Sequence, residues 1–118
     1  MKTKKEKKTI SALAIERLDA TLDAVESDPE RFNQGVWVRG TQNGKHAEMC
    51  FACFAIDLFG TAKERASLKF DGSYDKLGAQ ILNIERGITK RLFWGRNTIE
   101  EIKVIITELK GEANHDAM

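Results

Sequence analysis

Residues 46–60 read HAEMCFACFAIDLFG, a stretch that is apolar over almost its whole length. If it is a helix, a turn of about 100° per residue gathers its cysteines and its few polar residues on one side. Those residues are His46, Cys50, Cys53 and Asp57. Because a helix that is apolar nearly all round is normally buried, we expect residues 46–60 to form the central helix of a small core. Gly60 is placed to end that helix with a left-handed cap.

The rest of the chain predicts a mostly α fold, a compact bundle of four main helices plus short helices. Apolar residues recur at helical spacing on both sides of the central segment, over residues 9–27, 73–88 and 98–111. Thr61 with Glu64, and Thr98 with Glu101, have the spacing of a capping box, so a short helix begins after Thr61 and the last helix after Thr98. Glycines around Val36-Trp37-Val38 and the Asn43-Gly44 turn predict a small extended or hairpin element near residues 35–46.

Length and composition indicate one globular domain. The chain has 118 residues, of which 42% are hydrophobic and 31% charged, and its formal net charge is +1. We expect a basic arm over residues 1–8, a single helical domain over 9–111 and a flexible tail over 112–118. The charge balance does not direct the chain to nucleic acid or to a membrane surface. No secretory signal or membrane-spanning stretch is visible, and two cysteines make no disulfide framework, which favours a cytoplasmic location.

The two cysteines raise the question of a metal or redox site. Thiolates, imidazole and carboxylate all bind zinc, but the four candidate side chains spread over about 16 Å of one helix axis, too far to surround one ion. Redox-active pairs lie at a helix N-terminus, whereas Cys50 and Cys53 are expected in mid-helix. We therefore interpret them as buried packing residues, with no metal and no cofactor. Asp57 would then need a partner, either an arginine (Arg39, Arg86 or Arg91) or a ligand.

The best candidates for a binding site are aromatic and arginine residues in two predicted loops. Trp37 and Arg39 belong to the glycine-bracketed segment, and Trp94 and Arg96 to the loop before the last helix. Tryptophan and arginine dominate binding hot spots and stack on planar ligands. If the loops meet, they line a pocket or interface, with Asp57 and Arg86 as further polar contacts. The alternative is that both tryptophans plug the ends of the bundle.

These residues favour a small non-enzymatic binding protein that captures a small molecule or a protein partner. We also expect it to form a homo-oligomer, because the core of a small domain cannot easily bury several apolar stripes and nine aromatic residues. A nucleic-acid-associated accessory or regulatory protein is an alternative, given the basic run Arg86, Lys90, Arg91 and Arg96. A small enzyme is a further alternative, although no phosphate loop, nucleophile elbow or HExxH motif is present.

Several of these residues also follow, in order, the pattern of a known family. Gly35, Trp37, Gly40, Cys50, Trp94 and the pair Glu101-Ile102 resemble the G-W-x-x-G, C-x-x-G-A, W-N-D and T-x-x-E-V motifs of short helical domains from actinobacteria and phages. The resemblance covers residues 10–110, although Val36 separates Gly35 from Trp37 and Cys53 stands where the family has glycine. It implies a compact helical domain and a phage or mobile-element origin. It transfers no catalytic residue.

Overall fold

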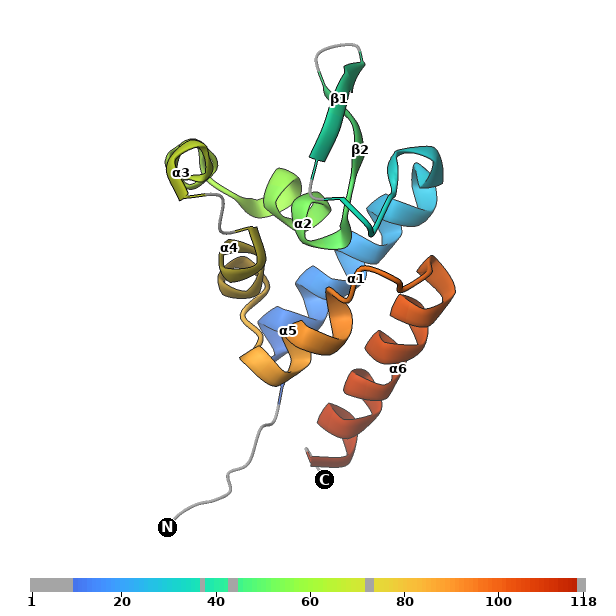
Figure 1. The fold of residues 1–118 in the computed structure, drawn as a ribbon. Helices are drawn as coiled ribbons and strands as arrows, with labels where there is room; N and C mark the ends of the chain where they lie inside the picture. The colour runs from blue at the N-terminus through green and yellow to red at the C-terminus, as the bar shows by residue number, and fades with distance from the viewer. Residues whose placement is uncertain (1–9, 37, 43–44, 72–73, 117–118) are drawn as a thin grey trace.

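The computed structural model describes residues 10–36, 38–42, 45–71 and 74–116. This part of the chain is mostly helical, as predicted, with six α-helices, one turn of 3-10 helix and one β-hairpin that projects from the helices (Figure 1). In chain order the elements are α1 (Ala12–Ser27), η1 (Pro29–Arg31), β1 (Val38–Gln42), β2 (Lys45–Met49), α2 (Phe51–Phe59), α3 (Ala62–Asp71), α4 (Tyr74–Leu82), α5 (Arg86–Leu92) and α6 (Ile99–Asp116).

Helix α2 lies at the centre of the core, because its first six residues, 51–56, are all buried. Phe51 is fully buried, and side chains from α1, α4, α5 and α6 complete the cluster around it. The predicted central position is therefore confirmed for residues 51–56. Its C-terminal end differs, because Asp57 and Leu58 are exposed.

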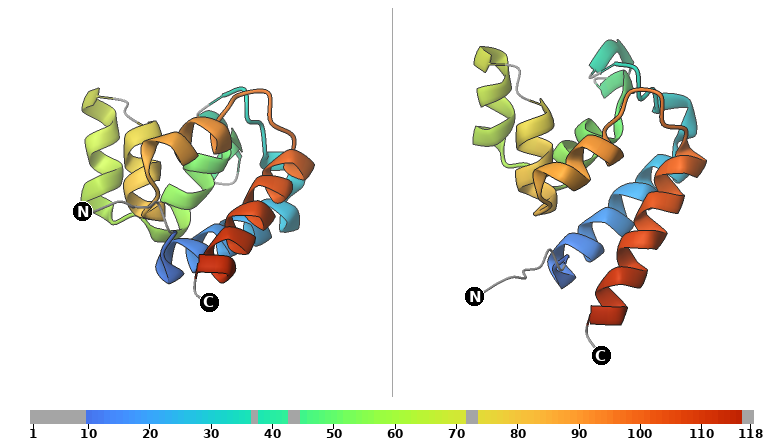
Figure 2. Two further views of the ribbon diagram at one scale, coloured as in Figure 1. Left: turned by 90° about the horizontal axis from the view of Figure 1, so that it is seen from below. Right: turned by 60° about the horizontal axis from the view of Figure 1, so that its bottom comes forward.

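Helices α1 and α6 run antiparallel along one side of α2, as the two views of Figure 2 show. Lys103 near the start of α6 pairs with Glu26 near the end of α1 at 3.3 Å, and Lys110 pairs with Asp19 at 3.2 Å. The predicted apolar stripes of both helices face inward. Their buried members are Leu18, Leu22, Val25, Ile102, Ile106 and Leu109.

The hairpin corrects the predicted extent of the central helix. Strands β1 and β2 pair antiparallel, with Val38 opposite Met49 and Thr41 opposite His46, so residues 46–49 are extended rather than helical. The carbonyl of Met49 accepts a hydrogen bond from the backbone amide of Asn33 at 3.0 Å, which holds the chain extended up to the start of α2. The helix therefore begins at Phe51, with Cys50 as its N-cap residue.

The cap at the other end of α2 also differs from the prediction. Gly60 has φ −73° and ψ 144°, an extended conformation rather than a left-handed one. The reason is the helix that follows immediately. Thr61 and Glu64 form the predicted capping box of α3, with reciprocal bonds of 2.8 and 3.0 Å, and a residue leading into an N-cap is normally extended.

The helix predicted over residues 73–88 is divided in two. Helix α4 ends at Leu82, and Asn83 adopts φ 60°, the left-handed conformation that asparagine tolerates better than most residues. The amide of Ile84 then bonds the carbonyl of Ala79 at 3.1 Å, a Schellman closure that ends the helix. Residue 73, where this helix is predicted to begin, lies outside the described residues.

Helix α5 begins after Glu85, whose side chain accepts a bond from the amide of Gly87. It extends to Leu92, so the predicted loop that carries Trp94 and Arg96 begins only at Phe93. Helix α6 begins after the predicted capping box of Thr98 and Glu101 and continues beyond Gly111, its expected end, to Asp116.

Candidate functional site

Two of the segments that carry predicted site residues meet in the fold. A β-carbon on Gly95 would lie 3.6 Å from the carbonyl oxygen of Gln34 and 3.9 Å from the α-carbon of Gly35. The segment after η1 and the α5–α6 loop therefore touch through backbone, near the point where β2 leads into α2 (Figure 1).

The buried side chain of Gln34 joins these loops to the core. Its Nε2 donates to the carbonyl of Leu92 at 2.9 Å, and its Oε1 accepts from the amide of Phe51 at 2.9 Å. One amide group therefore satisfies a carbonyl at the end of α5 and an amide at the start of α2. Both of these backbone groups lack partners within their own helices.

Hydrogen bonds of Asn97 stabilise the loop that follows α5. Its Nδ2 donates to the carbonyls of Arg91 and Leu92 at 2.7 and 3.2 Å, and its backbone amide donates to the carbonyl of Trp94 at 3.0 Å. Trp94 nevertheless remains 57% exposed. The alternative in which Trp94 plugs the end of the bundle is therefore wrong, because this side chain lies mostly in solvent on a well-supported turn.

A hollow with a volume of about 590 Å³ lies where the two loops meet. Gly95 and Asn97 line the hollow. Trp94 and Arg96, which directly precede these two residues in the sequence, are exposed. We call the hollow together with Trp94 and Arg96 the Trp94 surface. The residues that line the hollow are Pro29, Phe32, Asn33, Gln34, Gly35, Gly95, Asn97, Thr98, Ile99 and Glu100.

The other predicted residues on the glycine-bracketed segment cannot be placed in this surface. Trp37 lies outside the described residues. Arg39 is part of β1, opposite Glu48 in the register, and its side chain lies outside the described part of the chain.

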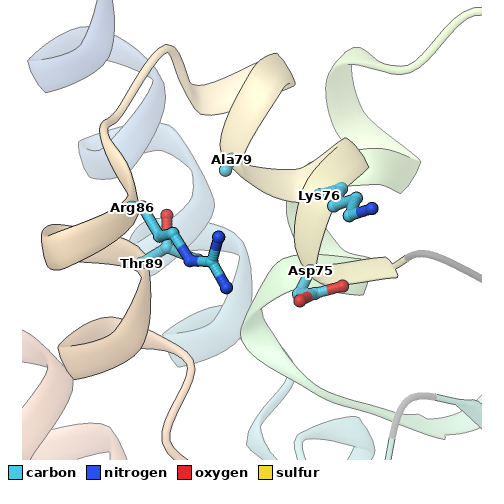
Figure 3. Close-up of a pocket in the computed structure, with 5 residues that line it drawn as sticks. All are labelled: Asp75, Lys76, Ala79, Arg86 and Thr89. Carbon is cyan, nitrogen blue, oxygen red and sulfur yellow. The ribbon is translucent and has the colours of Figure 1, made fainter.

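Arg86 lines a different hollow, of about 250 Å³, between α4 and α5. Figure 3 shows its guanidinium extending from α5 toward α4, where Asp75 also borders the space, while Lys76 extends away from it. Ala79 and Thr89 complete the lining. Arg86 and Trp94 lie at opposite ends of α5, which is seven residues long, about 10 Å. The structure therefore does not bring Arg86 and the Trp94 surface together as one site.

The environment of Asp57 differs from the one predicted for it. This side chain is exposed near the end of α2, so water solvates the carboxylate and no buried partner is required. Of the arginines considered as its partner, Arg91 instead pairs with Glu108 at 2.6 Å. Asp57 lines neither hollow.

The cysteines are buried, as predicted, but their position in α2 is not the predicted one. Cys50 is the N-cap residue and Cys53 lies in the first turn, and both are free thiols with 3% and 4% exposure. Interaction with the neighbouring Cys53 side chain lowers the pKa of Cys50, against the opposing effect of burial. The same interaction, and then burial, raises the pKa of Cys53. In the described part of the chain, no three His, Cys, Asp or Glu side chains gather closely enough to hold a metal ion.

The two residues that organise the Trp94 surface, Gln34 and Asn97, were not among the residues singled out from the sequence. The bonds of Gln34 span 17 and 58 residues, so no local spacing indicates them. Asn97 gives a weak signal, because its position directly before the Thr98 cap is typical of a structured turn.

Comparisons with protein-family models, with curated proteins and with solved structures give no match. The resemblance to the actinobacterial and phage domains stays a prediction. Among the described helices, none has both the length and the apolar character needed to cross a bilayer.

Proposed function

We propose that the protein is a non-enzymatic binding module that captures a protein partner through the Trp94 surface. The observation that carries this proposal is the 57% exposure of Trp94 on a turn held by three hydrogen bonds of Asn97. An exposed indole side chain contributes little to the stability of the isolated protein. A tryptophan on a preformed loop beside an arginine is typical of an interface hot spot, because little conformational entropy is lost when the partner docks.

The exposed lining of the hollow favours a protein partner over a small molecule. The volume of about 590 Å³ is within the range of ligand sites, but five of the ten lining residues are exposed. A small molecule seated there would keep much of its surface in water, whereas ligand sites commonly bury most of the ligand. A protein surface would cover the hollow and Trp94 together.

The test compares two alanine substitutions at apolar residues of equal exposure. Val104 lies on α6 and is 55% exposed, so Val104→Ala is a matched control for Trp94→Ala. Both variants should unfold within about 0.5 kcal/mol of the wild type, because neither side chain is buried. A photo-crosslinking residue at position 100, which is exposed and lines the hollow, leaves Trp94 intact and should capture a defined protein in the producing cells, whereas the same residue at position 104 should not.

The captured protein is then purified, and its affinity for each variant is measured by calorimetry. Trp94→Ala should weaken binding at least roughly 30-fold, the size of a hot-spot loss of about 2 kcal/mol, and Val104→Ala should leave it unchanged. Equal crosslinking at both positions, or equal affinity of both variants, would contradict the proposal. If a second copy of the chain is the captured species, sedimentation will show a dimer that Trp94→Ala dissociates.

A further inference from the structure

The hollow between α4 and α5 is bordered by side chains from both helices. Asp75 and Ala79 are four positions apart on α4, and Arg86 and Thr89 are three positions apart on α5, so each pair shares one side of its helix. All four residues line the hollow, whose volume is about 250 Å³. One helix therefore contributes a carboxylate to this space and the other contributes a guanidinium.

These two charged groups face the hollow without pairing with each other. Among the described residues, neither Asp75 nor Arg86 forms an ion pair. Figure 3 shows the guanidinium of Arg86 extending across the space toward α4, with Asp75 at the far border and Lys76 directed away. Both side chains are also exposed. The donors of one group and the acceptors of the other are therefore open to a molecule that enters the hollow.

The interior of the hollow adds one more acceptor and a small apolar surface. Thr89 is buried, and its hydroxyl donates its proton to the carbonyl of Glu85 at 3.0 Å, so its oxygen can only accept a further bond. Ala79 presents no more than a methyl group, which leaves room beside it. The hollow thus combines a cationic donor at Arg86 with acceptor oxygens at Asp75 and Thr89.

We propose that this hollow binds a small zwitterion, namely a free amino acid. The carboxylate of the ligand pairs with Arg86, whose parallel N–H groups suit its two oxygens. Its ammonium group pairs with Asp75 and donates to the hydroxyl of Thr89, and its carbon chain lies against Ala79. An anion alone would be repelled by Asp75 and a cation alone by Arg86, so a ligand that carries both charges is favoured over either.

The size and exposure of the hollow set the size and affinity of the ligand. Sites for drug-sized molecules occupy roughly 300–1,000 Å³, so a hollow of about 250 Å³ suits a smaller molecule. Affinity should be on the order of 1 mM, because exposed ion pairs contribute little. The Trp94 surface lies at the other end of α5, so binding at either place can be measured without the other.

The experiment titrates the isotope-labelled full-length protein with linear amino acids, from glycine to aminohexanoic acid, and follows its amide NMR spectrum. At least one of them should give saturable shifts confined to the parts of α4 and α5 around the hollow. Acetate and ethylamine, which carry one charge each, should bind at least roughly fivefold more weakly. The absence of saturable shifts would overturn the proposal, and so would equal binding of acetate, because it would indicate a simple anion site.

Three charge variants test the two walls of the hollow. Arg86→Gln and Asp75→Asn should each weaken binding of the best amino acid at least roughly fivefold, because one charge of the ligand loses its partner. Lys76→Gln is the matched control, since it removes a positive charge from the position next to Asp75 whose side chain is directed away, and it should leave the affinity unchanged. Equal affinities of Arg86→Gln and Lys76→Gln would refute the role of Arg86.

A fourth variant fills the hollow. Ala79→Leu should abolish binding, whereas Gln80→Leu, at the next and exposed position of α4, should not, because Gln80 does not line the hollow. Unchanged binding in Ala79→Leu would place the ligand elsewhere and contradict the proposal. The amide spectrum of each variant also shows whether it folds. If Ala79→Leu does not fold, the charge variants decide the outcome, because their side chains are exposed.

Discussion

Two helical glycines show how the surroundings of a single residue decide the effect of one methyl group. A β-carbon on Gly78, in α4, would lie 3.0 Å from the β-carbon of Ala52 and 3.2 Å from two ring carbons of Phe93. A β-carbon on Gly111, in α6, would meet no atom within 4 Å. Gly78 therefore permits close packing of α4 on α2 and on the residue after α5, whereas Gly111 only lowers the stability of its helix.

Alanine at these two glycines should change stability in opposite directions. Gly111→Ala should raise the free energy of unfolding by about 0.5–1 kcal/mol, because alanine is the better helix former. Gly78→Ala has the same intrinsic gain, but overpacking against Ala52 and Phe93 should make it destabilising by about 1–2 kcal/mol. Urea unfolding of both variants checks the prediction. A stabilising effect of Gly78→Ala would show that α2 and α4 can move apart at little cost.

At the scale of elements, side-chain caps define where several helices begin. Ser11, Glu85 and the two capping boxes each satisfy amides at a helix N-terminus. Both capping boxes were predicted, because their residues lie only three positions apart. The Asn83 break, the extended Gly60 and the late start of α2 were not, since they depend on backbone bonds or on a neighbouring element rather than on local spacing.

Removing the capping hydroxyl of Thr98 should lower the stability of the fold more than removing the hydroxyl of Thr107, which lies within the same helix. Thr98→Ala should destabilise the fold by about 1 kcal/mol, because the amide of Glu101 loses its hydroxyl partner. Thr107 lies in the middle of α6, exposed, and its hydroxyl bonds only the carbonyl of Lys103. Thr107→Ala should therefore be neutral or slightly stabilising. Thermal unfolding of the two variants side by side is the measurement, and equal shifts in Tm would be inconsistent with a capping role for Thr98.

At the scale of the whole molecule, the helices differ in how firmly the core holds them. The described side chains of α3, residues 62–66, are all exposed or partly exposed, whereas six consecutive residues of α2 are buried. Figure 1 shows α3 at the edge of the molecule, beside α4. The sequence predicts this contrast in part, because the α2 segment is apolar and the α3 segment carries charges. The Trp94 surface was predicted only as two loops that could meet, since the bonds that hold them are long-range.

Native-state hydrogen exchange should show this contrast directly. Amides of α3 should exchange by local opening, and those in the buried half of α2 only by global unfolding. We expect protection factors in α3 at least roughly 100-fold below those in α2. Comparable protection in the two helices would show that α3 belongs to the same cooperative unit as the core.

The side chain of Gln34 has a consequence for any attempt to isolate the Trp94 surface. Its two bonds fasten the loop to backbone groups of Phe51 and Leu92, which belong to two separate helices. The shape of the loops therefore depends on both helices. A synthetic peptide spanning residues 90–100 would carry the tryptophan and the arginine without the scaffold that positions them. A peptide that keeps the shape of this region would need a cyclic or stapled framework that reproduces the effect of one buried amide.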